Sequence, residues 1–243
     1  MVKRILGLVV VSVLAFGLFG CSNSSNSTSE PRENNNSTEQ AKSNEPQDLV
    51  LVDSNYVLSH GYVEYALEIQ NPNEDLAADF VTVTVTSKHA DGSIGFSDEW
   101  VVSDILPGST SYWASQAGDG DTIESDTVEI SLSVSERNWN KTDQTMPADL
   151  YTFDNVTVAP GQFSGLTAKG EITLNEDFSI GTRDGKSPML VCILKDANGS
   201  IIAGFSGYMN SDLTVGTPSV FDIDSMFDAV DYATAEMYAN MWL

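Results

Sequence analysis

The residue types that build catalytic and metal centres are scarce in this chain. Among its 243 residues are two histidines, His60 and His89, and two cysteines, Cys21 and Cys192. The sequence has no His-Glu-x-x-His motif, no Cys/His cluster and no phosphate-binding glycine loop, so the parts for metal hydrolysis and nucleotide chemistry are missing. Residues 204–208 approach a nucleophile elbow but end in Tyr where that motif needs Gly. We expect a non-enzymatic protein, with an enzyme of unrecognised type as the least favoured alternative.

Positive charge is also scarce. Eleven Lys and Arg residues face 35 Asp and Glu residues, for a formal net charge of −24. Phosphate backbones and anionic lipid head groups are bound through Lys and Arg, so a surface of this sign repels both. Nucleic acid is therefore excluded as a partner.

Only one long apolar run is present, and it lies at the N-terminus. Residues 5–19 follow Lys3 and Arg4, and this pattern predicts a secretory signal peptide over residues 1–20. The sequence Leu18-Phe19-Gly20-Cys21 resembles the lipobox of bacterial lipoproteins, which implies lipidation of Cys21 and an extracytoplasmic location on the bacterial membrane. An ordinary signal peptide that ends near a cysteine is the alternative. With Cys21 lipidated, Cys192 has no partner for an intrachain disulfide.

Large apolar residues are nearly absent from the segment after Cys21. Residues 22–47 consist mainly of Ser, Asn, Glu, Gln, Lys and Pro, which bury too little surface to offset the entropy of ordering. We therefore expect residues 21–47 to form a lipidated, disordered tether, with structure starting near Asp48.

No helical period of useful length follows, whereas a period of two recurs. Alternation indicates half-buried strands, and it is found at Val63, Tyr65, Leu67 and Ile69, at Val81, Val83 and Val85, and at Val128, Ile130, Leu132 and Val134. Turn signals at Asp91-Gly92 and Leu106-Pro107-Gly108 separate these runs, with a return strand expected near Trp100–Val102. Short strands at this spacing are typical of an antiparallel sandwich.

The chain repeats itself. Lys88–Ile94 reappears as Lys195–Ile201, shifted by 107 positions, and further landmarks recur at shifts of 103 to 108. We predict two diverged copies of one β-sandwich, over residues 48–140 and 147–243. The same comparison places Ala233, Ala235 and Met237 opposite Ile130, Leu132 and Val134.

The frame of each copy carries a family resemblance. A strand ending in Glu68-Ile69-Gln70-Asn71, the turn Asp196–Ile201 and the turns at Gly108 and Gly216 resemble the FxLYD domain, and Cys192–Asp196 keeps the Leu and Asp of its signature. The resemblance implies an all-β fold of two tandem, antiparallel immunoglobulin-like sandwiches in a bacterial envelope lipoprotein. It implies no catalytic residues.

Comparison of the two copies also indicates the surroundings of Cys192 and His89. Cys192 falls opposite Val85 in a run that is apolar on both faces, which favours a buried small hydrophobe over a reactive thiol or metal ligand. His89 corresponds to Asp196, so we interpret it as a solvated turn residue.

Two groups of residues remain as candidate binding sites. Asp119, Asp121, Glu124 and Asp126 lie within eight residues and are candidate ligands for weak Ca²⁺ binding, although their spacing is not that of an EF-hand and a solvated acidic loop explains them as well. Trp100, Tyr232 and Tyr238 are candidate interface anchors, as are Trp139 and Trp242, with ordinary packing as the alternative. The leading hypothesis is a lipid-anchored binding or structural module that contacts an envelope protein or glycan, and a Ca²⁺ or small-ligand module is the second.

Overall fold

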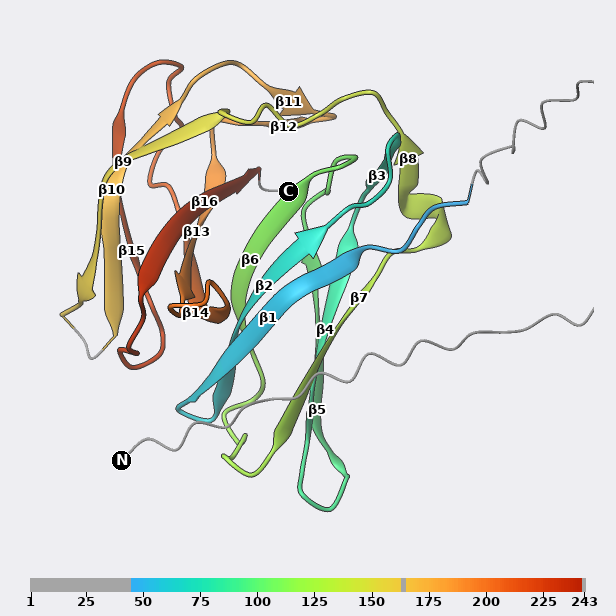
Figure 1. The fold of residues 1–243 in the computed structure, drawn as a ribbon, viewed down its shortest axis with the longest axis vertical. Coiled ribbons are helices and arrows are strands. Elements are labelled where there is room, and N and C mark those ends of the chain that lie inside the picture. The colour runs from blue at the N-terminus through green and yellow to red at the C-terminus, as the bar shows by residue number, and fades with distance from the viewer. Residues whose placement is uncertain (1–44, 163–164, 242–243) are drawn as a thin grey trace, which may run out of the picture. The chain divides into compact units, whose positions relative to one another are not determined.

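The computed structural model describes residues 45–162 and 165–241, and it is all β apart from one short 3-10 turn, η1 (Glu136–Asn138) (Figure 1). The all-β class predicted from the sequence is confirmed, with several antiparallel sheets consistent with tandem sandwiches. We call residues 45–141 the first half and residues 147–241 the second half. Within the described residues, no helix is long and apolar enough to cross a membrane.

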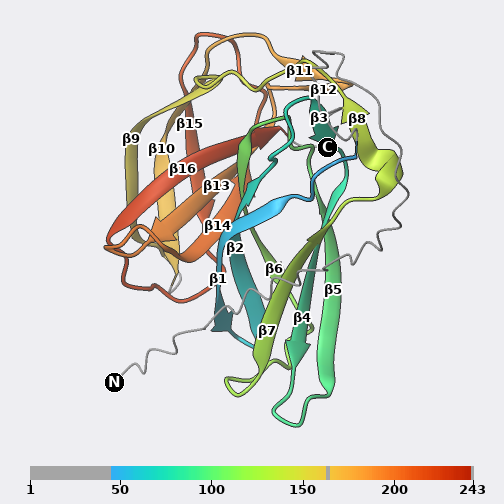
Figure 2. The ribbon, with the colours of Figure 1, turned by 45° about the vertical axis from the view of Figure 1, so that its right-hand side comes forward.

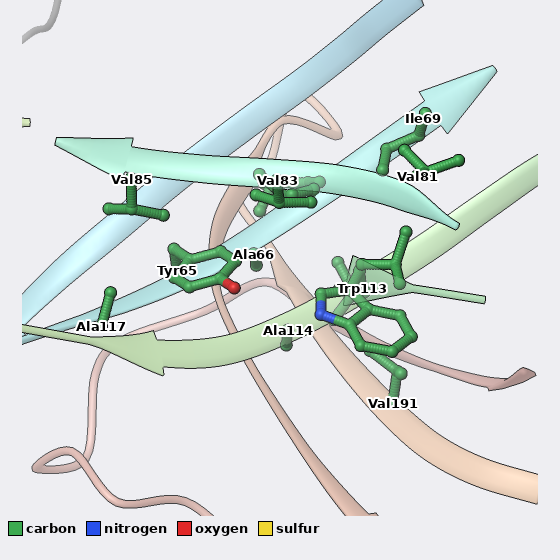
Figure 3. Close-up of a cluster of buried hydrophobic side chains, with 14 of the residues drawn as sticks. Tyr65, Ala66, Ile69, Val81, Val83, Val85, Trp113, Ala114, Ala117 and Val191 are labelled. Carbon is green, nitrogen blue, oxygen red and sulfur yellow. The ribbon is translucent and has the colours of Figure 1, made fainter. Parts of the chain in front are cut away.

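The first half contains two three-stranded antiparallel sheets, β1-β2-β6 and β5-β4-β7, and a short pair, β3-β8. Figures 1 and 2 show β4, β5 and β7 side by side. The bounds are β1 (Val50–Ser59), β2 (Tyr62–Gln70), β3 (Leu76–Ala78), β4 (Val81–Lys88), β5 (Ile94–Val102), β6 (Thr110–Ala117), β7 (Thr127–Ser133) and β8 (Trp139–Lys141). The predicted inward faces of β2 and β4 are buried, and Trp113 of β6 belongs to the same buried cluster (Figure 3).

The second half repeats this strand order in the sheets β9-β10-β15 and β14-β13-β16 and adds the hairpin β11-β12. Its bounds are β9 (Tyr151–Pro160), β10 (Leu166–Leu174), β11 (Ser179–Ile180), β12 (Arg183–Asp184), β13 (Pro188–Lys195), β14 (Ile201–Tyr208), β15 (Ser219–Asp224) and β16 (Thr234–Met241).

The duplicated hairpins match in detail. The backbone of His89 bonds Ser93 at 2.9 Å and that of Asp196 bonds Ser200 at 2.9 Å, and both turn glycines, Gly92 and Gly199, have φ of +85°. That left-handed φ favours glycine because it lacks Cβ.

The last strand differs from the sequence-based alignment. Val85 pairs with Ile130 and Cys192 pairs with Met237, so the shift of 107 continues to the end and Met237, not Ala233, corresponds to Ile130. The difference of four residues preserves the inward and outward faces, because four is a multiple of the strand period of two. Ala235 and Met237 pack against the core of the second half as expected.

β13 is buried on both faces. Leu190, Cys192 and Leu194 belong to the core of the second half, whereas Met189, Val191 and Ile193 belong to the core that contains β2, β4 and β6. Figure 3 shows Val191 of β13 in the same buried cluster as Trp113 and Ala114 of the first half. The β14-β13-β16 sheet is thus covered on one face by β9-β10-β15 and on the other by β1-β2-β6.

Small residues allow these sheets to approach closely. A methyl group added at Gly204 of β14 would come within 2.9 Å of the Ala66 Cβ atom on β2. Nearby, the Ser206 hydroxyl donates to the Ala114 carbonyl at 2.8 Å, and the Ile201 amide donates to Asp53 at 2.8 Å. Residues 44–243 accordingly form one compact unit.

Candidate functional site

The lipidation site expected at Cys21 lies outside the described residues, as do the expected signal peptide and most of the tether. The described chain is held in place from Gln47 onward. The Gln47 amide donates to the side-chain oxygen of Asn73 at 2.8 Å, and the Asn73 amide nitrogen donates back to the Gln47 carbonyl at 2.8 Å. These two reciprocal hydrogen bonds fix the point where the chain enters the first half.

The acidic loop before β7 does not gather its four carboxylates. Asp126 has a side chain only 1% exposed, whereas Asp119, Asp121 and Glu124 lie at the surface. Asp119 accepts the backbone amide of Asp121 at 3.1 Å. In residues 45–162 and 165–241, no group of three or more His, Cys, Asp or Glu side chains is placed to hold a metal ion.

His89 is the partner of Asp126, which sequence reasoning missed. Its Nδ1 lies 2.9 Å from Asp126 Oδ1, and the Ile123 amide donates to the other oxygen at 3.2 Å. The hydrogen bond to Asp126 raises the pKa of His89, and the same bond lowers the pKa of Asp126. His89 thus joins the β4–β5 turn to the acidic loop. The pairing has no local sequence signal, because 37 residues separate the two side chains.

The aromatic candidates lie in three different settings. Trp100, on the edge strand β5, is 46% exposed beside Val101, which is 40% exposed. Tyr232 is partly buried, and its hydroxyl donates to the Val158 carbonyl at 2.9 Å. Tyr238 stacks on Tyr112 with ring centroids 3.7 Å apart. Both tyrosines therefore make contacts within the chain, and Trp100 presents the larger free surface.

Cys192 is fully buried in the core of the second half, as predicted. Burial disfavours the thiolate and raises the pKa of Cys192 to about 12. The thiol therefore behaves as a small hydrophobe.

A groove lies along one edge of the first half. It measures about 410 Å³ and runs between β1 and β7, which lie next to each other in Figures 1 and 2. Its apolar lining is Leu49, Leu51, Ile130, Leu132, Val134 and Trp139, all of them half-buried, and Asp48, Ser131 and Ser133 supply polar groups. Sequence reasoning placed Ile130, Leu132 and Val134 on the inner face but gave no sign that this edge of the sandwich is open.

Both strands that border the groove are sheet edges. β1 pairs only with β2, and β7 pairs only with β4, among the described strands. Each strand therefore turns one row of backbone amides and carbonyls away from its sheet. The groove combines free backbone hydrogen-bonding groups with an apolar floor.

The second half carries a larger side chain at one position that corresponds to the groove lining. Leu51 pairs with Ile69 and Phe153 pairs with the matching Ile172, so Phe153 stands where the first half has Leu51. The Phe153 ring packs edge-on against Phe221 at 5.8 Å between centroids. The smaller leucine contributes to the open space in the first half.

Comparison with known protein families and with curated proteins finds no match to this chain.

Proposed function

We propose that this protein is a lipid-anchored, extracytoplasmic binding module of the bacterial envelope, without enzymatic activity, whose first half holds an extended segment of a partner protein. The resemblance of residues 18–21 to a lipobox supports the anchor, and the missing catalytic motifs support a binding role. The groove between β1 and β7 carries the proposal for the partner.

We also propose that each half has an immunoglobulin-like topology. The resemblance of the duplicated frame to FxLYD domains supports this topology. The repeated strand order, β1-β2-β6 with β5-β4-β7 and β9-β10-β15 with β14-β13-β16, is compatible with it.

The groove favours an extended polypeptide over a glycan. An added strand satisfies the free amides and carbonyls of a sheet edge, while its alternate side chains enter apolar pockets. The lining of Leu, Ile and Val residues suits such side chains, whereas it offers few polar groups to sugar hydroxyls.

The negative charge of the protein surface determines which extended segments it attracts. The described part of the chain pairs most of its Lys and Arg with carboxylates, as in Lys88–Glu129 and Lys141–Asp75, so the remaining acidic residues dominate the surface. A basic segment with alternating apolar residues is therefore the partner that this surface attracts.

A synthetic peptide that alternates Lys and Val tests the proposal. We expect it to bind the full chain, to perturb Trp139 fluorescence because Trp139 lines the groove, and to bind more weakly as salt is raised. Leu132→Glu places a charge in the groove floor and abolishes binding. Val220→Glu, at a position 79% exposed in the second half, is the matched control. Equal binding by both variants would show that the groove is not the peptide-binding site.

A further inference from the structure

Two tyrosine rings from different halves are in direct contact. Tyr112 lies on β6 of the first half and Tyr238 lies on β16 of the second. Their ring centroids are 3.7 Å apart and their planes are 17° from parallel. Each phenol is among the groups that influence the pKa of the other, so the hydroxyl ends of the two rings lie close together. Both side chains are half-buried, which leaves part of each ring in contact with solvent.

Hydrogen bonds hold the strands that carry these rings. The Asn240 amide nitrogen donates to the Tyr112 carbonyl at 2.6 Å, and the Ser111 hydroxyl donates to the Asn240 side-chain oxygen at 3.1 Å. β16 is therefore bonded to β6 two residues from Tyr238. The two rings meet in a fixed register.

A carboxylate is placed to accept a proton from one of the phenols. The Tyr238 hydroxyl donates to Glu236 Oε2, and Lys195 Nζ lies 2.6 Å from the same oxygen. The hydrogen bonds from Lys195 and Tyr238 lower the pKa of Glu236, so this side chain is ionised at neutral pH. A phenol that loses an electron becomes strongly acidic, and a bonded carboxylate takes up its proton.

The same lysine makes the two tyrosines unequal. Lys195 Nζ lies 5.4 Å from the centroid of the Tyr112 ring. A cation near a ring face is attracted to its electrons and opposes the removal of one of them. Tyr238, which is bonded to the carboxylate, is therefore the ring that is oxidised first.

We propose that Tyr112 and Tyr238 form an oxidative cross-linking site, where a diffusible one-electron oxidant joins the two rings as dityrosine. Each phenol gives one electron to an oxidant molecule and releases one proton, and the Tyr238 proton goes first to Glu236. The two phenoxyl radicals form a carbon–carbon bond between the ring carbons next to their oxygens. The hydrogens of these carbons then move to the oxygens and restore both aromatic rings. The chain loses two hydrogen atoms in total, and two oxidant molecules are each reduced by one electron.

The cross-link gives the chain a covalent bond between its halves. The ring carbons have to move from stacking distance to bonding distance, and the half-buried position of both rings leaves them room on the solvent side. Among the described residues the one cysteine, Cys192, is buried and unpaired, so no disulfide supplies such a bond there. A bond between β6 and β16 closes a long loop and reduces the entropy of the unfolded chain. The inference does not depend on the proposed peptide-binding function.

Photo-oxidation of the full chain at low concentration tests the inference, with ruthenium tris-bipyridyl as the one-electron oxidant and persulfate as its electron acceptor. We expect dityrosine fluorescence in a product that stays monomeric on a denaturing gel. Mass spectrometry is expected to find the tryptic peptides 89–137 and 196–243 joined, with two hydrogen atoms lost. The unfolding temperature rises by about 10 °C, because the cross-link constrains the unfolded state. Cross-links only between copies of the chain would overturn the proposal, as would oxidised tyrosines without this joined pair of peptides.

Phenylalanine variants assign the cross-link to these two rings. Tyr112→Phe and Tyr238→Phe keep the stacked ring and the fold, as circular dichroism would show, but each removes a phenol and abolishes the joined peptides. Tyr208→Phe, at a position 54% exposed in the same tryptic peptide as Tyr238, is the matched control and retains them. Glu236→Gln removes the proton acceptor and slows the cross-link by about tenfold or more. Joined peptides that persist in Tyr112→Phe or in Tyr238→Phe would assign the bond to other tyrosines and overturn the proposal.

Discussion

The contact between His89 and Asp126 makes part of the stability of the first half depend on pH. The pKa of His89 is raised above its ordinary value of 6.5, so its contribution is complete below about pH 6.5 and is lost as pH rises through the raised pKa. The pKa of Asp126 is lowered from 3.8, so its contribution is complete above that value and is lost as pH falls through the lowered pKa. The pair stabilises most between these limits.

We therefore predict that His89→Asn removes a pH-dependent component of the free energy of unfolding. Urea titrations from pH 5 to pH 8 measure it. The wild-type advantage over the variant is largest near pH 5 and shrinks toward pH 8. Lys88→Gln, which removes the neighbouring exposed ion pair with Glu129, serves as control and leaves the slope of the wild type unchanged across this range. A variant with the wild-type slope would contradict the prediction.

Cys192 provides a second test with a single side chain. Its burial and raised pKa leave almost no thiolate in the folded state, and the thiolate is the reactive species. We predict that a maleimide or disulfide reagent leaves Cys192 unmodified in the native protein and modifies it fully in denaturant, as mass spectrometry would show. Rapid labelling of the native protein would mean that β13 is exposed.

The sequence predicted the surroundings of Cys192 better than those of His89. The position of Cys192 in an apolar run, opposite Val85, was enough to predict its burial. His89 was interpreted as a solvated turn residue and is indeed exposed beside the turn, but its pairing with the buried carboxylate of Asp126 was missed. The repeat was a poor guide here, because Asp196 at the matching turn bonds its own backbone neighbours instead.

A comparison of the outer faces of β4 and β13 explains why β13, unlike β4, is buried on both faces. At matching register β4 carries Thr82, Thr84 and Thr86, whereas β13 carries Met189, Val191 and Ile193. The threonines of β4 are half-buried at the outer face of their sheet, while all three β13 residues are buried against the first half. Strands covered on both sides are apolar throughout.

We predict that Val191→Thr, which copies the residue at position 84, lowers the free energy of unfolding by about 1–3 kcal/mol, because it buries a hydroxyl in an apolar contact. Urea unfolding monitored by tryptophan fluorescence measures the change. The reverse substitution, Thr84→Val, changes stability by less than about 0.5 kcal/mol, because that face is not covered by a second sheet. Similar losses in both variants would contradict the difference between the two faces.

Strands with clean alternation were predictable and edge strands were less so. The alternating apolar residues of β2 and β4 identified both. β1 was missed because Asp53 and Asn55 interrupt the pattern, and both side chains bond Ile201 of the second half. β5 extends from Ile94 to Val102 instead of the short stretch expected around Trp100, because an exposed edge strand is under little pressure to alternate.

The stacking of sheets across both halves implies cooperative unfolding. The core that contains β2, β4 and β6 also contains residues of β13 and β14, so loss of one half exposes apolar surface of the other. We predict a single calorimetric transition with equal calorimetric and van't Hoff enthalpies. The triple variant M189T/V191T/I193T is expected to separate it into two transitions. Two transitions in the wild type would show that the halves unfold independently.

The anchor is a prediction from the sequence for the whole molecule. We expect Cys21→Ser to abolish incorporation of labelled palmitate and to move the protein from the detergent phase to the aqueous phase. Cys192→Ser is the matched control and retains both properties, because that residue is buried in the fold. Partition of Cys21→Ser with the detergent would point to a different mode of membrane attachment.

The duplication was visible in the sequence, but the contact between the halves was not. Repeated turn residues lie at fixed positions and are easy to align. The contact depends on Gly204 and Ala66, and small residues of this kind are common in strands for many reasons. The one available signal was the run Met189–Leu194, apolar on both faces, which required a covering sheet that the sequence did not identify.

The clamp between Gln47 and Asn73 determines how mechanical load crosses the molecule. The tether from the proposed anchor enters at Gln47, and the next two residues, Asp48 and Leu49, already line the groove. A pull between the membrane and a segment held in that groove would pass through the clamp and through the two strands that border the groove, β1 and β7. The second half would receive tension through its contacts with β1, such as those of Asp53 and Asn55 with Ile201.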